Sequence, residues 1–596
     1  MHYTIGHHDN PMTKSKKKHD TSHDGITQTP WFLTSLERIQ TQSPDAVLFE
    51  TFQHDGTLVH HTRQKIAEIV SKLAGALIQL DIRPEQRIAI DANISWEICA
   101  IWLAAITIGA VPVFYPTDMR FRDKRTDLEQ DVGEQQGPLT IITEYPDQAK
   151  LWLEASGLPT PHIICLRNKT KDDQTLEQIF DKEIPSQIIR FDDFTNNQTD
   201  PVSPFKVPEN EPVAFVYTQG SHSRTARRIV ISHNHLLAQA EDLQTRFNID
   251  QNSKLYIDLI SPHAVTLSVI ATSIFTGATV LIPESDVHAL EVHKNIHSIT
   301  HAFLLPDSIQ SILNDIQMPS HKRFRDFFFK LAKYRNRHTQ KWHKWQNEGI
   351  KRLLINPFNN KYFPSLKALI SYGNHFDAKA AERISWLDIN VYNAFTLGEL
   401  GFVHIHAFNG TGGFLKSIEA RIKSGILSVK SSRINGPFIQ TDDLVFEDER
   451  CGLCSHRTSP IVTDNDEVID TSPTRDILKR NIFIDEIYIY GEKRPFLTAL
   501  IYINEKAIME WAQANHLEDS SFETLTQNEQ FYTFIRSIVD NCNNSRSAKE
   551  SIQKIALLNR PLDKDPHIVS PCGLTRFKEI EHRYHAILES FYQNNF

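Results

Sequence analysis

The sequence predicts an α/β protein in which a large amino-terminal domain of parallel-rich sheets flanked by helices precedes a small α+β carboxyl-terminal domain. Three observations lead to this prediction. The chain has 596 residues, more than one hydrophobic core normally organises. From about Trp31 to Glu284, helical patterns alternate with short apolar runs, as in proteins built from parallel βαβ units. After Val445 the chain becomes polar and rich in turns, and a different pattern of elements follows.

The first half of the chain supplies the elements of the parallel sheets. Apolar residues recur at helical spacing between Arg63 and Leu80, and the next run, RIAIDA, has the length of a buried strand. The longest apolar run, Ile98–Tyr115, is broken by Gly109 and Pro112, so we expect a buried helix leading into a core strand rather than a membrane span. The series continues with strands expected at 139–144, 162–166, 254–261 and 279–284 and a helix at 265–278.

The last part of the chain predicts a separate domain of roughly 130 residues, within the usual range for a domain. Residues 482–491 and 496–503 alternate like the two strands of a hairpin. Helical patterns follow at 505–516, 531–543 and 577–592. We expect the boundary between about Arg457 and Asp466. This divides the chain into a disordered polar lead-in (1–28), a large domain (29–457) and a small domain (458–596).

Composition argues against several classes of protein. The net charge is −9, from 64 basic and 73 acidic residues, and gives no general argument for nucleic-acid binding. The first 25 residues are polar and lack the apolar segment of a signal peptide. The six cysteines are sparse and unpatterned, which favours a reducing compartment. We therefore expect a soluble, cytoplasmic protein that binds no nucleic acid.

One pair of cysteines has the spacing of metal ligands. Cys451 and Cys454 form a CxxC pair, and His456 is close to it. A structural zinc site needs four ligands, and no fourth is evident. Incidental thiols in a turn are therefore the favoured interpretation, with a zinc site as the weaker alternative.

A basic and aromatic segment at 321–352 interrupts the α/β pattern. It holds eleven Lys or Arg residues, and Phe324, Phe328 and Leu331 fall on one helical face. Such a helix can lie on an anionic membrane, which predicts peripheral membrane contact through 321–352. The favoured alternative is a surface helix whose aromatic side chains pack on the fold. Nucleic-acid stacking lacks any accompanying binding module.

The segment from Val213 to His233 gives the first indication of a chemical function. An apolar strand runs into a loop of glycine, hydroxyl residues and arginines, and a helix is expected to begin near Ser232. Hydroxyl groups and backbone amides of such a loop can donate hydrogen bonds to phosphates, and arginine adds charge and fork geometry. The loop has no GxxxxGK[ST] pattern, so it is not a Walker loop.

This loop resembles the phosphate loop of the adenylate-forming (AMP-binding) superfamily, YTSGTTGxPKG. The matching residues are Tyr217, Thr218, Gly220 and Ser221. The residues that depart from the pattern are Gln219, His222, Ser223, Ala226, Arg227 and Arg228, with one extra residue in the loop. A side chain in place of a glycine obstructs the approach of backbone amides to a phosphate. The resemblance therefore implies a phosphate loop that is only half preserved.

The resemblance covers nearly the whole chain and is strongest to the long-chain acyl-CoA synthetases. Similar segments occur at 87–117, 261–284, 301–312, 366–377 and 482–503. The basic segment 321–352 lies where long-chain acyl-CoA synthetases carry an extra helical segment. The resemblance thus implies their fold, in which the small carboxyl-terminal domain is mobile.

Four residues match the family's nucleotide and metal contacts. Phe395 corresponds to the aromatic residue that stacks on adenine, and Glu399 to the carboxylate that binds magnesium. Between them, Gly398 replaces a phosphate-binding threonine. Asp443 and Arg457 correspond to the two contacts with the ribose hydroxyl groups. The resemblance therefore implies that much of a nucleotide site is retained.

A lysine that the family uses for adenylation is missing. The segment VSPCGLTRFKEIEHRY resembles the family's TPTxKxRR segment, whose lysine reaches the substrate carboxylate and the α-phosphate. Aligned on Pro571 and Tyr584, that position holds Leu574, and a shift by one residue gives Gly573. Upstream, Thr471 and Arg475 replace a proline and a glutamate of the family pattern. Neither alignment restores the cation.

The resemblance implies a function and its cofactors. Members use ATP with Mg²⁺ to convert a carboxylic acid to an acyl-adenylate, from which coenzyme A displaces AMP. Here this implies activation of a long-chain fatty acid, with Thr218, Gly220, Ser221, Phe395, Asp443 and Arg457 binding the nucleotide and Glu399 the metal. In one hypothesis the ligase is slow and Arg227 substitutes for the lost lysine. In the other, a pseudo-enzyme binds nucleotide, an acyl group or a partner protein without catalysis.

Overall fold

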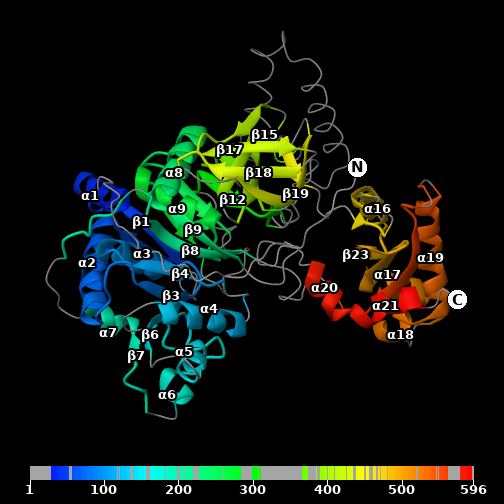
Figure 1. Ribbon diagram of the computed structural model, residues 1–596, viewed down its shortest axis with the longest axis horizontal. Coiled ribbons are helices and arrows are strands. Elements are labelled where there is room, and N and C mark those ends of the chain that lie inside the picture. The colour runs from blue at the N-terminus through cyan, green and yellow to red at the C-terminus, as the bar shows by residue number, and fades with distance from the viewer. Residues whose placement is uncertain are drawn as a thin grey trace, which may run out of the picture.

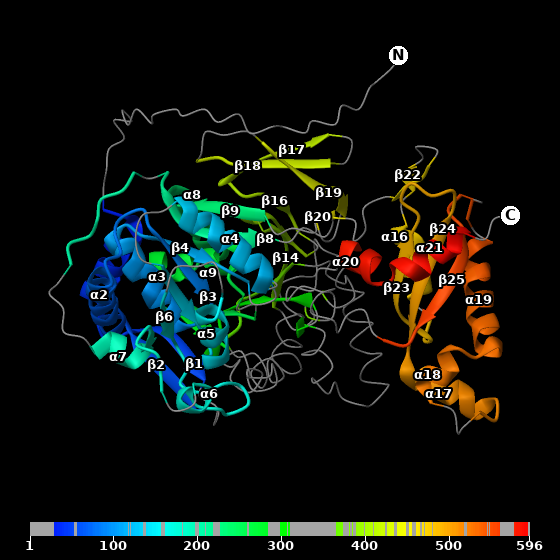
Figure 2. The same ribbon diagram turned by 60° about the horizontal axis from the view of Figure 1, so that its bottom comes forward.

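The computed structural model describes most of the chain (Figures 1 and 2). The residues outside the described part are 1–28, 53–56, 117–118, 120, 135–138, 156–160, 181–182, 197–201, 209, 219–226, 259–260, 284–297, 307, 310–364, 374–380, 382–383, 385–388, 399, 409, 424–425, 434–437, 449–451, 456–460, 465–467, 470, 480, 518–520, 545, 548, 561–576 and 594–596.

The larger of the two main sheets has nine strands. They are β1 (Val47–Phe52), β2 (Leu58–Thr62), β10 (Lys254–Ile257), β11 (Thr279–Ile282), β12 (His301–Leu304), β13 (Ala368–Tyr372), β14 (Asn390–Leu397), β15 (Gly401–Ala407) and β16 (Gly412–Phe414). Their spatial order is β16-β15-β14-β13-β12-β10-β11-β1-β2. The run from β14 to β1 is parallel, and the strands beyond it at either edge are antiparallel.

The second main sheet has seven strands. They are β3 (Arg87–Asp91), β4 (Val111–Phe114), β5 (Thr140–Thr143), β6 (His162–Cys165), β7 (Ile188–Arg190), β8 (Pro212–Thr218) and β9 (Arg227–Ser232). The order is β7-β6-β5-β3-β4-β8-β9, and all neighbours are parallel except β8 and β9. The predicted parallel-rich sheets are therefore confirmed.

Helices cover these sheets and fill the space between them. They are α1 (Trp31–Gln42), α2 (Arg63–Gln79), α3 (Trp96–Ile108), α4 (Phe121–Glu134), α5 (Pro146–Leu153), α6 (Leu176–Ile179), α7 (Phe191–Asn196), α8 (His233–Phe247) and α9 (Ala264–Thr276). Every residue of α3 from Glu97 to Ile108 is buried, as its continuous apolar run predicts. One apolar core includes α3 together with Phe49 of β1 and Ile88 of β3 and so spans both sheets.

The core changes where the predicted domain boundary lies. A four-stranded antiparallel sheet contains β17 (Ile418–Lys423), β18 (Ile426–Ser431), β19 (Ile439–Asp448) and β20 (Gly452–Ser455). Leu453 of β20 belongs to the large core. The next strands, β21 (Ile461–Val462) and β22 (Val468–Ile469), pair with each other and pack into a separate core. The boundary at 457/458 falls between these two cores and stays a prediction.

The smaller carboxyl-terminal part is α+β (Figure 1). Its further elements are α16 (Ser472–Leu478), β23 (Ile484–Tyr490), β24 (Leu497–Ile503), α17 (Glu505–Ala514), α18 (Phe522–Thr526), α19 (Glu529–Asn543), β25 (Ile552–Leu558), α20 (Phe577–Arg583) and α21 (His585–Gln593). The predicted hairpin is present as β23 and β24, with β25 parallel to β24. The single helix expected over 577–592 is instead two helices, but Ile580 and Leu588 still enter one core.

Two sequence predictions lie outside the described residues. The basic segment 321–352 is one, so peripheral membrane contact remains a prediction. Cys451 and His456 of the CxxC region are also outside, and among the described residues no group of three or more His, Cys, Asp or Glu could hold a metal ion. Over the described part of the chain, no helix is both long enough and apolar enough to cross a membrane.

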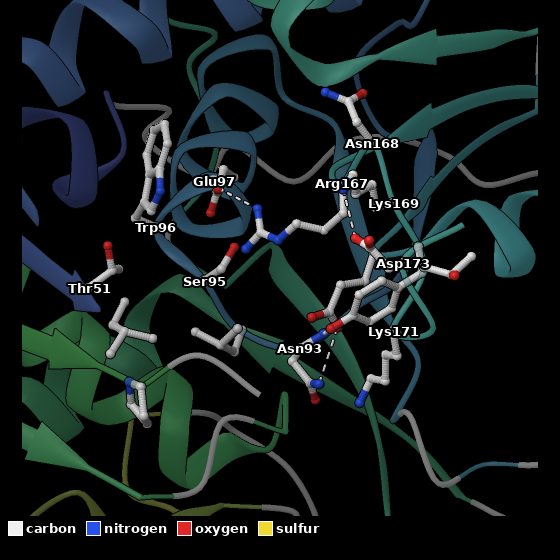
Figure 3. Close-up of a pocket in the computed structure, with 16 residues that line it drawn as sticks. Thr51, Asn93, Ser95, Trp96, Glu97, Arg167, Asn168, Lys169, Lys171 and Asp173 are labelled. Atoms are coloured by element: carbon white, nitrogen blue, oxygen red, sulfur yellow. Dashed lines mark hydrogen bonds and ion pairs between the residues drawn. The ribbon is translucent and has the colours of Figure 1, made fainter. Parts of the chain in front are cut away.

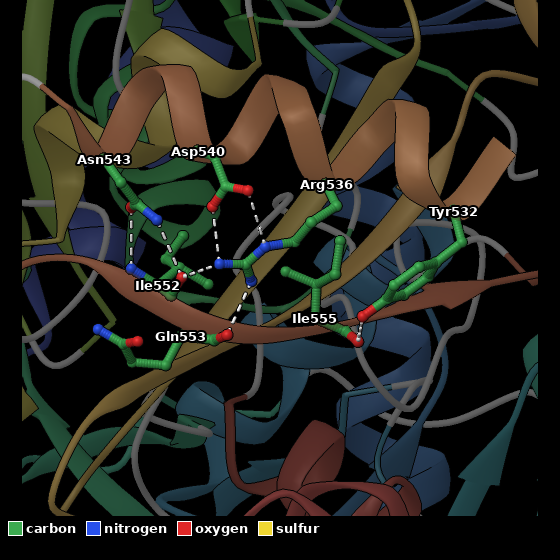
Figure 4. Close-up of polar contacts among 7 residues, drawn as sticks. All are labelled: Tyr532, Arg536, Asp540, Asn543, Ile552, Gln553 and Ile555. Carbon is green, nitrogen blue, oxygen red and sulfur yellow. Dashed lines mark hydrogen bonds and ion pairs between the residues drawn. The ribbon is translucent and has the colours of Figure 1, made fainter. Parts of the chain in front are cut away.

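Side chains of α19 cover the free edge of β25 (Figure 4). Asn543 donates from Nδ2 to the carbonyl oxygen of Ile552 at 3.0 Å and accepts from the amide of the same residue at 3.0 Å. Arg536 donates to the carbonyl of Gln553 at 2.8 Å while paired with Asp540 at 2.7 Å. An uncovered edge strand would present these groups to another chain, so the helix protects the edge.

We predict that Asn543→Ala destabilises the carboxyl-terminal part by about 1–3 kcal/mol, because the amide of Ile552 loses its partner and the carbonyl of Ile552 keeps only the 3.3 Å contact with Arg536. Urea unfolding of the full chain, followed by hydrogen exchange within β25, measures the effect. The exposed residue Gln530 of the same helix provides the control, and Gln530→Ala should change stability by less than about 0.5 kcal/mol. Equal effects of the two substitutions would contradict the proposed role of Asn543.

Four buried histidines make the large domain sensitive to acid. Burial lowers the pKa of His61, His233, His235 and His404 to about 4 each. The ring nitrogens of His235 lie 3.0 Å from the Ser431 hydroxyl and 3.0 Å from the Leu400 carbonyl. A carbonyl only accepts, so Nε2 donates to Leu400 and the neutral Nδ1 accepts from Ser431. Protonation of Nδ1 would remove this acceptor.

We predict that the free energy of unfolding falls as the pH drops from 6.5 toward about 4. The folded-state pKa values lie below the unfolded value, so the unfolded state binds more protons throughout this window and the stability present at higher pH is lost. Urea midpoints measured across the window test this. His235→Gln keeps a donor and an acceptor. It should reduce the slope of the free energy of unfolding against pH by the equivalent of about one bound proton. The exposed His582→Gln is the control, and an unchanged slope in His235→Gln would refute the assignment.

Candidate nucleotide site

The predicted phosphate loop is the turn of a β-hairpin. Strands β8 and β9 are antiparallel, and Thr218 and Arg227 face each other as the last pair before the turn. The sequence analysis expected only a loop between β8 and the following helix, so it missed β9. The helix start was correct, because Ser232 caps α8 by accepting from the amide of His235 at 3.2 Å. The apolar run of β9 is short and begins with two arginines, which hid its strand character.

A partly buried polar cluster anchors the base of this hairpin. Asp127 of α4 accepts from the Tyr115 hydroxyl at 2.9 Å and from Arg228 at 3.0 Å, and it also accepts from Tyr217. Arg228 in turn donates to the Tyr217 oxygen at 2.8 Å. The two tyrosine rings stack with centroids 5.2 Å apart. The cluster joins α4, β4, β8 and β9 and therefore fixes the direction in which the loop leaves the sheet.

The cluster also determines the protonation state of Tyr217 and the partner of Arg228. Burial raises the pKa of Tyr217 far above its ordinary value, with the Asp127 carboxylate adding to the effect, so the hydroxyl remains a donor. Arg228 is committed to an ion pair whose two side chains are 23% and 19% exposed. The cluster thus includes Arg228, one of the two arginines in place of the family's Lys-Gly. The side chain of Arg227 lies outside the described residues.

The remaining predicted site residues fall partly outside the described chain. Phe395 is in β14, is 9% exposed and lies opposite His404 of β15. Asp443 is in β19, but only its backbone is described, as is also true of Thr218 at the end of β8. The predicted residues outside the described part are Gly220, Ser221, Glu399 and Arg457. The structure therefore positions the elements that carry the nucleotide contacts without testing the contacts themselves.

The edges of the sheets match the chemistry of a nucleotide site. β8 is parallel to β4, and β14 continues the parallel run of the larger sheet, so Thr218 and Leu397 both end parallel strands at their carboxyl ends. Ligands of parallel α/β sheets bind beyond such ends. Loop amides and hydroxyl groups suit phosphates, and one carboxylate suffices for Mg²⁺, which keeps waters and phosphate oxygens as its other ligands. Glu399 would supply that carboxylate.

Sequence reasoning missed a buried carboxyl group at the same edge of the larger sheet. Asp258 follows β10 and accepts from the Tyr372 hydroxyl at 2.8 Å and from the amide of Leu305 at 2.6 Å. Burial raises the pKa of Asp258 to about 6. The signal was a single acidic residue inside the apolar run KLYIDLIS. The contacts of Asp258 with Tyr372 and Leu305 join the ends of three neighbouring parallel strands, β10, β12 and β13.

We predict that Asp127→Asn loosens the β8–β9 hairpin. The substitution removes the ion pair with Arg228, and this loss destabilises the hairpin by roughly 1–3 kcal/mol. Hydrogen exchange of the β9 amides should become faster, while exchange in β3 stays unchanged. Glu129→Gln on the same helix is the control, because its ion pair with Arg125 at 2.8 Å is more exposed and contributes only about 0–1 kcal/mol. Unchanged exchange in β9 would show that the cluster does not hold the hairpin.

Comparison with known proteins shows which family and which solved structures this chain resembles. The family model described as AMP-binding enzyme matches residues 36–422. The long-chain-fatty-acid–CoA ligase FadD15 of Mycobacterium tuberculosis is 19% identical, and the alignment covers 93% of this chain and 95% of that protein. The similarity thus extends over both parts of the chain.

Solved structures with the same fold are adenylate-forming enzymes. The adenylation domain of a carboxylate reductase from Mycobacterium chelonae has a TM-score of 0.67 at 13% identity, covering 96% of this chain and 92% of that domain. O-succinylbenzoate coenzyme A synthetase from Bacillus subtilis, solved with ATP and a magnesium ion, has a TM-score of 0.61 at 13% identity, covering 90% and 96%. MatB from Rhodopseudomonas palustris, solved with ATP, has a TM-score of 0.64 at 12% identity, covering 93% and 99%.

These likenesses agree with the two-part α/β architecture. Because the family model spans well over half of the sequence, the chain belongs to the AMP-binding enzyme family.

Proposed function

We propose that this chain is an AMP-forming acyl-CoA synthetase-like protein that binds ATP and a long-chain fatty acid but forms the acyl-adenylate far more slowly than an intact site would. The observation that carries the proposal is the ion pair between Arg228 and Asp127. It commits Arg228 in a protein that already has Leu574 at the position of the adenylating lysine, so of the two neighbouring arginines Arg227 is the one proposed as the substitute cation.

The long-chain substrate rests on similarity along the whole chain. The ligase from Mycobacterium tuberculosis, named for long-chain fatty acids, aligns with 93% of this sequence. The chain also keeps a segment, 321–352, at the position of the extra helical segment of long-chain enzymes. A carboxylic acid is the substrate class of the family, and the long acyl chain is our proposal.

The retained residues support binding of the nucleotide. Phe395 would stack on adenine, and Asp443 with Arg457 would accept and donate hydrogen bonds at the ribose hydroxyl groups. The β8–β9 turn would bind phosphates through Thr218, Gly220 and Ser221, with its base fixed by Asp127. ATP with Mg²⁺ at Glu399 would supply the electrophilic α-phosphorus, and coenzyme A the thiol that accepts the acyl group.

The missing cation determines the rate. When the carboxylate attacks the α-phosphorus, negative charge gathers between them, and a positioned positive group stabilises that state. Loss of one such group costs about 10²–10³ in rate. Leu574 offers no charge, and Arg228 is held in the Asp127 cluster. Arg227 is then the substitute cation that the slow-ligase hypothesis requires.

A second candidate, a pseudo-enzyme that binds nucleotide without catalysis, is favoured by the number of separate losses. Gly398, Gln219, His222, Ser223 and Thr471 each replace a residue of the family pattern. These replacements affect different parts of the reaction. A protein under selection for catalysis would keep most of the family's residues at these positions. Binding of the nucleotide needs fewer of these groups than catalysis does.

We predict that Leu574→Lys raises the rate of ATP–pyrophosphate exchange by about 10²-fold with long-chain fatty acids, because it restores a positioned cation. Labelled pyrophosphate, ATP, Mg²⁺ and a panel of fatty acids measure the exchange. Asp443→Ala defines the background, since it removes a ribose contact.

Three results separate the hypotheses. Slow exchange in the unmodified protein that increases in Leu574→Lys supports the slow ligase. No exchange in either protein, together with stabilisation by AMP in a thermal unfolding assay, supports the pseudo-enzyme. Exchange in the unmodified protein at least as fast as in Leu574→Lys refutes the importance of the lost lysine.

A further inference from the structure

Helix α4, which supplies Asp127 to the polar cluster at the base of the β8–β9 hairpin, has a weak apolar face. Its 14 residues include three apolar side chains, Phe121, Leu128 and Val132. Lys124 lies between Phe121 and Leu128 at spacings of three and four residues and is buried like Leu128, so it occupies the centre of the inward face. Apolar contacts are non-directional, and a few of them leave the rotation of a helix poorly fixed.

A buried ion pair lies at the centre of this face. Nζ of Lys124 donates to Oδ1 of Asp91, the last residue of β3, at 2.7 Å, and the two side chains are only 5% and 4% exposed. The other oxygen of Asp91 accepts from the indole N–H of Trp152 in α5 at 3.0 Å. The Trp152 ring also meets Phe121 edge-on, with ring centroids 4.7 Å apart. The amino-terminal half of α4 is therefore attached to β3 and α5.

The end of β3 is itself held by its neighbours. Asn93, two residues after Asp91, donates to Oε2 of Glu144 from its backbone amide and from Nδ2, each at 3.2 Å. Glu144 directly follows β5. Figure 3 shows Asn93 beside a polar pocket, together with the ion pair between Arg167 and Glu97 at 2.7 Å, which joins the end of β6 to the start of α3. Asp91 thus belongs to a frame of linked strand ends, and α4 is attached to this frame.

The ion pair of Lys124 controls where Asp127 lies. The two residues are three apart on α4 and are therefore neighbours on its surface. Asp127 accepts from Tyr115 at 2.9 Å and from Arg228 at 3.0 Å. A slip of α4 by one residue, which moves the helix by about 1.5 Å and turns it by about 100°, would carry the carboxylate away from both partners. The pair with Asp91 opposes this slip, because the slip would separate two buried charges.

The pair is better explained by orientation than by stability. Removing two charges from water is costly, and apolar side chains of similar volume often stabilise a protein as well or better. An apolar residue at position 124 would, however, pack in more than one rotation of α4. The pair selects one rotation, in which Asp127 accepts from Tyr217 and Arg228 on either side of the phosphate loop.

We propose that Lys124, through its ion pair with Asp91, is a positioning residue for the phosphate loop of the candidate nucleotide site. It acts by placing Asp127 and does not itself touch the nucleotide. The role of Lys124 in ligand binding rests on the proposed function, whereas its effect on the hairpin depends on no ligand. The two can therefore be measured separately.

Lys124→Met in the full chain tests the proposal, with Arg125→Met as the matched control. Arg125 is the next residue of α4 and pairs with Glu129 on a more exposed side of the helix. Without ligand, hydrogen exchange of the β9 amides should become about tenfold faster in Lys124→Met, while exchange in β10 of the other sheet stays unchanged. AMP binding, measured by calorimetry, should weaken about tenfold. Arg125→Met should change neither.

A cycle of two substitutions distinguishes positioning from general stability. In an Asp127→Asn background, Lys124→Met should add less than about twofold to either effect, because the contact through which it acts is already lost. If Lys124→Met does not fold, Lys124→Gln combined with Asp91→Asn leaves no unpaired buried charge. This variant should still accelerate exchange in β9, because an amide pair is weaker than a charged one.

Three results would overturn the proposal in whichever of these variants folds. They are unchanged exchange in β9, equal acceleration in β9 and β10, and full additivity with Asp127→Asn. Faster exchange in β9, in a chain whose unmodified form binds no AMP, would support the role of Lys124 in the hairpin and refute nucleotide binding instead.

Discussion

The rest of the large domain depends on the nearly complete burial of two largely apolar helices. α3 and α9 have no exposed polar face: nearly all of their residues are buried, and the buried hydroxyl groups of α9 donate to carbonyl oxygens. A helix that is apolar all round must be covered on every side, and two sheets with their outer helices provide that cover. Gly109 and Gly277, both in the left-handed conformation, end these helices and turn the chain directly into the next strands.

Buried polar groups then fix the orientation of the helices that surround this core. Arg63, 2% exposed, donates to the carbonyl of Gly277 at 2.5 Å and to that of Ile39 at 3.3 Å, and so binds the ends of α9 and α1. Gln239 of α8 donates to the carbonyl of Phe402 at 2.9 Å and accepts from its amide at 2.9 Å. Each group is costly when left unpaired, so these contacts specify one arrangement of otherwise interchangeable apolar surfaces.

Internal polar contacts of this kind also explain how the fold can remain stable when residues needed for catalysis are lost. The Asp127 cluster holds the β8–β9 hairpin through side chains that need no ligand, and it does so with Arg228, a residue that departs from the family pattern. A hairpin held in this way keeps its shape whether or not the turn binds phosphate. Stability therefore places no demand on Leu574 or on the missing glycines of the loop.

The sequence by itself determined the elements whose signal is local. Long apolar runs predicted α3, α9 and the strands that follow them. Alternation predicted the β23–β24 hairpin, and Ser232 marked the start of α8. Only the tertiary structure decided which distant residues meet. The clusters around Asp127 and Asp258, the Glu97–Arg167 pair and the strand β9 depend on contacts between segments far apart in the chain, and no local pattern encodes them. Hence the family contacts could be predicted from motifs, whereas the commitment of Arg228 could not.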